Sequence, residues 1–92
     1  MAARNRVAEA ARYEDAGRYE EAVASYERAL KFLEWMPFSI TYRVQVLSGL
    51  GDGRSGKGDY KRAIAFYQTA LRLDPAYTPA LMGLGDVYQN QR

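Results

Sequence analysis

The chain has 92 residues, 48% of them hydrophobic and 26% charged, which is too apolar for a disordered protein and fits one small domain. It contains no cysteine and no histidine, so disulfides, thiolate nucleophiles, thiolate zinc sites and imidazole catalysis are excluded. The formal net charge of +2 is too small for the dense basic surface that is typical of nucleic-acid binding. We therefore expect no nucleic-acid partner, no metal and no other cofactor.

Apolar residues recur at three- and four-residue steps along most of the chain, as in amphipathic helices. The pattern predicts five helices, at about 3–15, 19–34, 39–55, 59–73 and 78–90. Asp59 is a suitable N-cap for the fourth helix, and Asp74-Pro75 ends it. Thr78 is the expected N-cap of the fifth helix, with Pro79 in its first turn. No segment predicts a strand, so the expected fold class is all-α.

The third predicted helix, 39–55, contains Gly49, Gly51 and Gly53. A glycine inside a helix costs about 1 kcal/mol relative to alanine. Local propensity therefore makes this helix the least stable of the five.

The sequence repeats itself. The tetrapeptide Gly49-Leu50-Gly51-Asp52 returns as Gly83-Leu84-Gly85-Asp86, which is 34 residues later (49 to 83). A second match joins residues 17–23 to residues 58–64. Its spacing of 41 residues (17 to 58) equals 34 plus a seven-residue insertion at about 34–40.

This pattern resembles the tetratricopeptide repeat, W-x2-L-G-x2-Y…A-x3-F…P over 34 residues. The second copy carries Leu47, Leu50, Gly51, Ala63, Tyr67, Ala70 and Pro75, and a third begins with Leu81, Leu84, Gly85 and Tyr88. A weaker first copy carries Ala10, Tyr13, Ala22, Tyr26 and Ala29. Arg54 departs from the pattern, because a tyrosine is usual there.

The resemblance implies one domain over 1–92, built of antiparallel helix pairs stacked as a short right-handed α-solenoid. Repeat 1 would span about 3–36, the insertion about 34–40, repeat 2 about 44–77 and a half repeat 78–92. Such proteins hold peptides or helices of partner proteins in a concave groove and catalyse nothing, so we expect no enzyme. By position in the repeat, the groove residues would be Glu14, Gln45, Ser48, Asp52, Met82 and Asp86.

Two equivalent groove positions are acidic, Asp52 and Asp86, which favours a partner with basic residues. The alternative is that both are ordinary solvated aspartates. One subfamily clamps the terminal carboxylate of chaperones with basic and amide side chains. Here the matching residues cannot bind a carboxylate through their side chains, so we expect no chaperone-tail binding: Val7, Ala11, Gly49, Pro79 and Gly83.

The insertion and the last helix offer two further surfaces. Trp35, Met36 and Phe38 form a candidate hydrophobic contact, since Trp and Met are enriched at interface cores. The alternative is that they cover the ends of their own helices. The last helix carries a predicted exposed apolar face of Leu81, Leu84, Val87 and Tyr88. Solenoids need covered ends, so we expect a homodimer that self-assembles through this face or a fragment of a longer protein.

The segment from Gly51 to Lys57 matches the first seven positions of a phosphate-binding P-loop. The next position should carry a magnesium-binding hydroxyl and is Gly58 instead. Phosphate or nucleotide binding at this segment is thus a remote alternative to a glycine-rich turn between helices.

No apolar run approaches the roughly 20 residues that span a bilayer, and no signal for secretion is visible. We expect no membrane partner and a cytoplasmic location, with nothing in the sequence against the nucleus.

Overall fold

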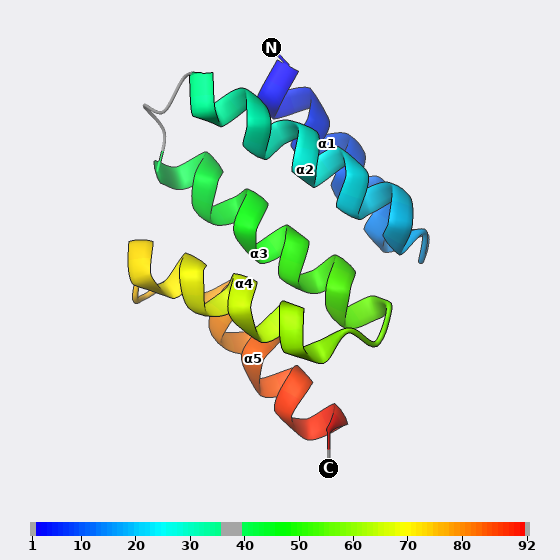
Figure 1. Ribbon diagram of the computed structural model, residues 1–92, viewed down its shortest axis with the longest axis vertical. Coiled ribbons are helices and arrows are strands. Elements are labelled where there is room, and N and C mark those ends of the chain that lie inside the picture. Colours follow the sequence, from blue (N-terminus) through cyan, green and yellow to red (C-terminus); the bar gives the residue numbers. More distant parts are fainter. Residues whose placement is uncertain (1, 36–39, 92) are drawn as a thin grey trace.

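The computed structural model describes residues 2–35 and 40–91, with side chains from Val7 to Leu33 and from Ile40 to Gln91. These residues form five helices and no strand, which confirms the all-α prediction (Figure 1). The helices are α1 (Ala2–Asp15), α2 (Tyr19–Trp35), α3 (Ile40–Gly56), α4 (Tyr60–Leu73) and α5 (Thr78–Asn90). Every observed end lies within one residue of its predicted position.

The helices form stacked pairs. α1 packs against α2, and α3 packs against α4, while α2 also contacts α3. α1 contacts α3, and α3 contacts α5, so these three helices follow one another along one side of the molecule. This is the arrangement of a helical solenoid. Within the described residues no helix is long and apolar enough to cross a membrane.

The two turns inside the pairs have the same geometry. Gly17 and Gly58 have φ angles of 76° and 83°, in the left-handed region that glycine enters at no steric cost. In each turn the next amide bonds to a carbonyl five residues back at 2.8 Å: Arg18 to Tyr13, and Asp59 to Arg54. These bonds end α1 and α3 and reverse the chain.

The starts of the last two helices agree only in part with the sequence. Asp59 caps α4 as predicted, because its carboxylate accepts the Arg62 amide at 3.4 Å. Thr78, expected as the N-cap of α5, is already helical. The cap position is Tyr77, whose side chain makes no capping bond, and the fixed φ of Pro79 supports the first turn instead.

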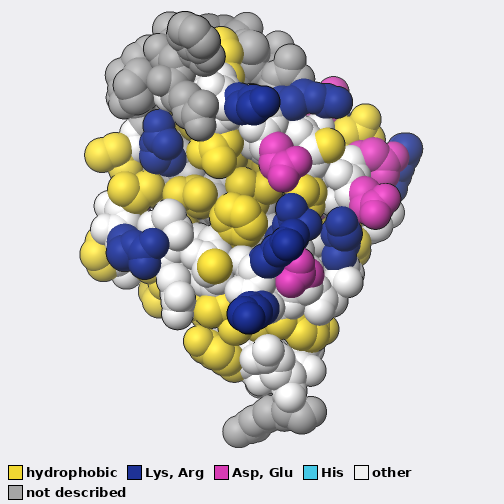
Figure 2. All heavy atoms as spheres, viewed as in Figure 1, with side chains coloured by type: hydrophobic (Ala, Val, Ile, Leu, Met, Phe, Trp, Pro, Cys, Tyr) yellow, Lys and Arg dark blue, Asp and Glu magenta, His cyan; other side chains and the backbone are white. Residues whose placement is uncertain are grey.

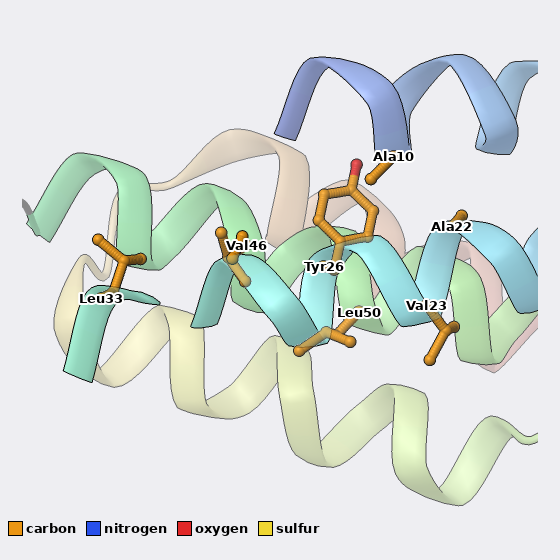
Figure 3. Packing of buried hydrophobic residues seen from close by; sticks show 8 residues of the cluster. Ala10, Ala22, Val23, Tyr26, Leu33, Val46 and Leu50 are labelled. Carbon is orange, nitrogen blue, oxygen red and sulfur yellow. The ribbon is translucent and has the colours of Figure 1, made fainter. Parts of the chain in front are cut away.

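Two buried clusters make up the core. The first joins α1, α2 and α3 and includes the residues drawn in Figure 3, in which the Tyr26 ring points from α2 toward Ala10 of α1. The second joins α3, α4 and α5 around the buried Tyr67. Phe66 packs against both clusters, and α3 supplies side chains to both. α3 therefore lies at the centre of the molecule.

The glycines of α3 and α5 are points of close approach. A Cβ added to Gly49 would clash with carbons of the Tyr26 ring, and one added to Gly83 would clash with the Tyr67 ring. The two contacts are equivalent in the repeat, because both tyrosines come from the second helix of one pair and both glycines from the first helix of the next. Glycine is needed here for space rather than for backbone freedom.

Candidate functional site

Two adjoining hollows lie on the side of the molecule formed by α1, α3 and α5. The first measures about 250 Å³ and is lined by Val7, Ala11, Glu14, Asp15, Tyr26, Gln45, Ser48, Gly49, Asp52, Tyr77 and Pro79. The second measures about 370 Å³ and is lined by Glu14, Asp15, Tyr19, Asp52, Ser55, Gly56, Tyr67, Gly83, Asp86 and Asn90. They share Glu14, Asp15 and Asp52. We refer to the two together as the groove.

The described charges around the groove all have one sign. Among the side chains from Val7 to Leu33 and from Ile40 to Gln91, the charged lining residues are Glu14, Asp15, Asp52 and Asp86, and no lysine or arginine lines either hollow. Figure 2 shows a contrasting surface, the face over α2, α3 and α4, where Lys and Arg side chains lie among hydrophobic and acidic ones. A chain with a net charge of +2 thus has a locally acidic groove.

The sequence places these carboxylates by helical spacing. Ser48 and Asp52 stand four residues apart on α3 and so face the same side, with Gln45 one turn before Ser48. Glu14 and Asp15 end α1, directly before the Gly17 turn. Carboxylates are unfavourable near the C-terminus of a helix, by about 0.3–1 kcal/mol. Helix stability therefore does not explain why α1 ends in two acids.

Two core tyrosines hold two of the carboxylates. The Tyr26 hydroxyl donates to Glu14 Oε1 at 3.1 Å, and the Tyr67 hydroxyl donates to Asp52 Oδ1. The rings of the same tyrosines pack against Gly49 and Gly83. The packing that stacks one helix pair on the next therefore also positions the acids in the groove.

Burial and mutual repulsion alter the acidity of this pair. Burial, followed by the charge of Asp52 and a hydrogen bond with its carboxyl group, raises the pKa of Glu14 to about 7. Burial also raises the pKa of Asp52, while the hydrogen bond from Tyr67 and that with Glu14 act in the opposite direction. The pKa values of the Tyr26 and Tyr67 hydroxyls are raised as well, first by burial and then by these carboxylates. The raised pKa of Glu14 means that this carboxyl group exchanges its proton near neutral pH.

Ser48 is the buried polar residue of the groove. Its side chain is only 3% exposed, and its Oγ has no hydrogen-bond partner. An unpaired buried hydroxyl costs about 1–3 kcal/mol. A group bound in the groove would find an unused hydrogen-bonding atom beside Asp52.

Most of the predicted groove residues come together. Glu14, Gln45, Ser48, Asp52 and Asp86 line the hollows, whereas Met82 lines neither and its side chain is largely exposed. Sequence reasoning missed Asp15, which follows Glu14 in α1 and lines both hollows. It also missed the tyrosine hydroxyls as partners of the acids. The repeat pattern identifies those tyrosines as core residues but gives no direction for their hydroxyl groups.

The predicted apolar face of the last helix agrees with the structure only in part. Leu81 and Tyr88 are about half exposed, and Leu84 packs partly against the second core cluster. Val87 was expected on the same exposed face, and this was wrong, because it is fully buried in that cluster. Trp35 is the last residue of α2, but its side chain and residues 36–39, with Met36 and Phe38, lie outside the described part.

The P-loop alternative fails on geometry. Residues 51–56 belong to α3, and the amides of Lys57, Gly58 and Asp59 all donate to backbone carbonyls of residues 53–55. No amide remains to cradle a phosphate. The basic side chains are engaged as well, since Arg54 pairs with Glu27 at 3.6 Å and Lys57 with Glu20 at 3.7 Å.

The described surface outside the groove has a further hollow. A hollow of about 460 Å³ runs along α2, lined by Ala24, Glu27, Arg28, Leu30 and Lys31. It is larger than either part of the groove, but one helix lines it and its charges are mixed. Among the described residues, no group of three or more His, Cys, Asp or Glu side chains is arranged to hold a metal ion.

The sequence was then compared with known proteins. Residues 6–34 match a family model described as "Tetratricopeptide repeat", and residues 56–91 match one described as "TPR repeat". The chain belongs to the tetratricopeptide repeat family. Proteins of this family are generally protein–protein interaction modules and typically non-catalytic. No curated protein matches the chain. The predicted repeat boundaries stay a prediction.

Proposed function

We propose that this tetratricopeptide repeat chain binds a basic segment of a partner protein in the groove formed by α1, α3 and α5. One observation carries the proposal: the charged side chains that line the two hollows, among those the structure describes, are all acidic. Arginine and lysine side chains of a partner would form charge-assisted hydrogen bonds with these carboxylates. The same charges repel an acidic chaperone tail, so this part of the prediction is retained.

The floor of the groove suits an extended segment or a helix that lies close to the protein. Ala11, Gly49 and Gly83 present little or no side chain, which lets a partner backbone approach α1, α3 and α5. Gln45 lines the first hollow and Asn90 the second, and the side-chain amide of each can bond to a partner backbone. The acidic groups select a partner segment of positive charge, whereas the small residues do not select the shape of its side chains.

The test uses a fluorescein-labelled peptide in which arginine alternates with alanine, capped at both ends, and a glutamate version as its negative control. Fluorescence anisotropy at two salt concentrations gives the affinity. The decisive variant is Asp15→Lys/Asp86→Lys, because both side chains are exposed and neither has a hydrogen bond in the groove. The matched control is Glu20→Lys/Glu27→Lys, which changes the net charge equally on another surface.

We expect the groove variant to bind at least tenfold more weakly and the control to stay within about twofold of the unmodified protein, since long-range charge effects are largely screened at physiological salt. Circular dichroism checks that both variants fold. Equal losses in the two variants would show a non-specific attraction and would sink the proposal.

Self-association through α5 is the second candidate. Leu81 is 50% exposed, whereas its repeat equivalent on α3, Leu47, is 7% exposed beneath α4. Tyr88 is 51% exposed on the same helix, and a Cβ added to Gly85 would meet no neighbour within 4 Å. A second copy of α5 would cover this face.

Analytical ultracentrifugation tests this candidate. We expect a concentration-dependent dimer that Leu81→Glu/Tyr88→Glu abolishes, because two carboxylates would then be buried in the interface. A monomer at every concentration up to about 1 mM, where weak interfaces still form, would exclude it.

A further inference from the structure

The strongest feature beyond the general charge of the groove is a meeting point of three groups from two helices. Glu14 comes from the last turn of α1, and Asp52 and Ser48 come from one face of α3. All three line the same hollow of about 250 Å³. The inference below rests on the proposed function, because it names the chemistry of one subsite within the proposed groove.

Among the side chains that the structure describes, the groups that act on this meeting point are acids and tyrosine hydroxyls. Asp15 on α1, Asp86 on α5 and the Tyr77 hydroxyl before α5 act on the Glu14–Asp52 pair or are acted on by it. The Tyr26 hydroxyl of α2 and the Tyr67 hydroxyl of α4 donate to it. Burial raises the pKa of Glu14, and two carboxyl groups this close also resist simultaneous ionisation, which raises it further and favours a shared proton in the free protein.

Ser48 is an observation independent of the acids. It is 3% exposed, lines the same hollow and leaves its Oγ without a partner. A proton shared by the two carboxyl groups does not give Ser48 Oγ a hydrogen-bond partner. The site therefore keeps a negative charge beside an unused hydrogen-bond acceptor, and a cation with several donors could satisfy both.

We propose that Glu14, Asp52 and Ser48 form the binding site of one arginine side chain of the partner, whose guanidinium donates hydrogen bonds to the two carboxyl groups and to the Ser48 hydroxyl oxygen. The reaction balances as one guanidinium cation bound to two carboxylates, with the displaced proton released to solvent. Partner binding is thereby linked to the loss of one proton.

Arginine fits this binding site better than lysine does. Its guanidinium carries five N–H donors in one plane, enough for two carboxylates and a hydroxyl oxygen at once. The ammonium group of lysine has three donors and acts as a compact point charge. The two tyrosine hydroxyls occupy one oxygen each and leave the other acceptor sites of the carboxylates for the partner.

The linkage predicts the size of the pH effect. The displaced proton belongs to Glu14, whose pKa is about 7. At pH 6 the proton is bound and its removal weakens the binding of the peptide, whereas at pH 8 it is already absent. The dissociation constant should therefore fall about tenfold between pH 6 and pH 8. The chain contains no histidine, so no other side chain ordinarily titrates in this range.

The experiment measures the anisotropy of the capped arginine–alanine peptide at pH 6, 7 and 8 and constant ionic strength, together with its citrulline and lysine versions. Glu14→Gln keeps the shape of the side chain and cannot ionise. Glu27→Gln, on α2 outside the groove, is the matched control. Calorimetry in two buffers with different ionisation enthalpies counts the released proton in the unmodified protein, so this readout does not depend on how a variant folds.

Support requires a tenfold gain in affinity from pH 6 to pH 8 for the arginine peptide and release of about one proton on binding at pH 6. The gain should be lost in Glu14→Gln and retained in Glu27→Gln. Ser48→Ala should weaken arginine binding and leave the pH dependence intact. Binding that is equal at pH 6 and pH 8 would overturn this inference and leave the proposed function standing. A lysine peptide with the same affinity and proton release would overturn the arginine assignment. No binding at any pH would overturn both proposals.

Discussion

At the scale of single residues, the groove is controlled by contacts between core aromatics and acids. Tyr26 and Tyr67 are buried, and each directs its hydroxyl to a carboxylate that lines the groove. Such bonds contribute about 0.5–1.5 kcal/mol each when neutral and more when the acceptor is charged. They also fix where the carboxylates stand, which matters more for recognition than for stability.

The raised pKa of Glu14 predicts how the stability of the protein depends on pH. Its pKa is 4.5 when unperturbed and about 7 in the folded protein, so the folded state binds the proton more tightly. This stabilisation is complete below about pH 4.5 and is lost as the pH rises through 7. Urea denaturation should show a fall on the order of 1 kcal/mol between pH 5 and pH 8, because water screens this half-exposed group. In Glu14→Gln this loss should shrink markedly, and an unchanged loss would contradict the assignment.

At the scale of helices, the glycines have two distinct roles. Gly83 and Gly85 both lie inside α5, two residues apart. The Tyr67 ring occupies the space beside Gly83, whereas nothing lies within 4 Å of a Cβ added to Gly85. Helix propensity alone treats the two positions as equal.

This difference predicts opposite signs for the same substitution. Gly83→Ala should destabilise the protein by about 1–3 kcal/mol, because the added methyl group overpacks the Tyr67 contact. Gly85→Ala should stabilise it by about 0.5–1 kcal/mol through helix propensity. Denaturation of both variants in urea measures the two values, and equal effects would show that the Tyr67 ring moves aside freely.

At the scale of the whole molecule, stability is expected to decrease from the centre outward. α3 contributes to both core clusters and contacts every other helix, while α5 contacts only α3 and α4. Helix propensity made the glycine-rich third helix the least stable of the five. Tertiary packing reverses that order, because its glycines are buried contact points rather than exposed backbone.

Native-state hydrogen exchange checks this order. Amides in the middle of α3 should exchange only on global unfolding, and those of α5 should exchange by local opening with a lower free energy. Slower exchange in α5 than in α3 would contradict the packing argument. In that case an additional contact, such as the proposed self-association of α5, would have to protect the last helix.

The sequence by itself determined the five helices, their ends and the family. These features follow from apolar periodicity and glycine turns, which act over one or two helical turns, and from a 34-residue repeat that can be read directly along the chain. The repeat also placed Asp52 and Asp86 on one side of the stack. Only the tertiary structure brought Glu14 to Asp52, left Ser48 without a partner and buried Val87. These outcomes depend on how closely two helices distant in sequence approach each other, and a period along one chain does not contain that distance.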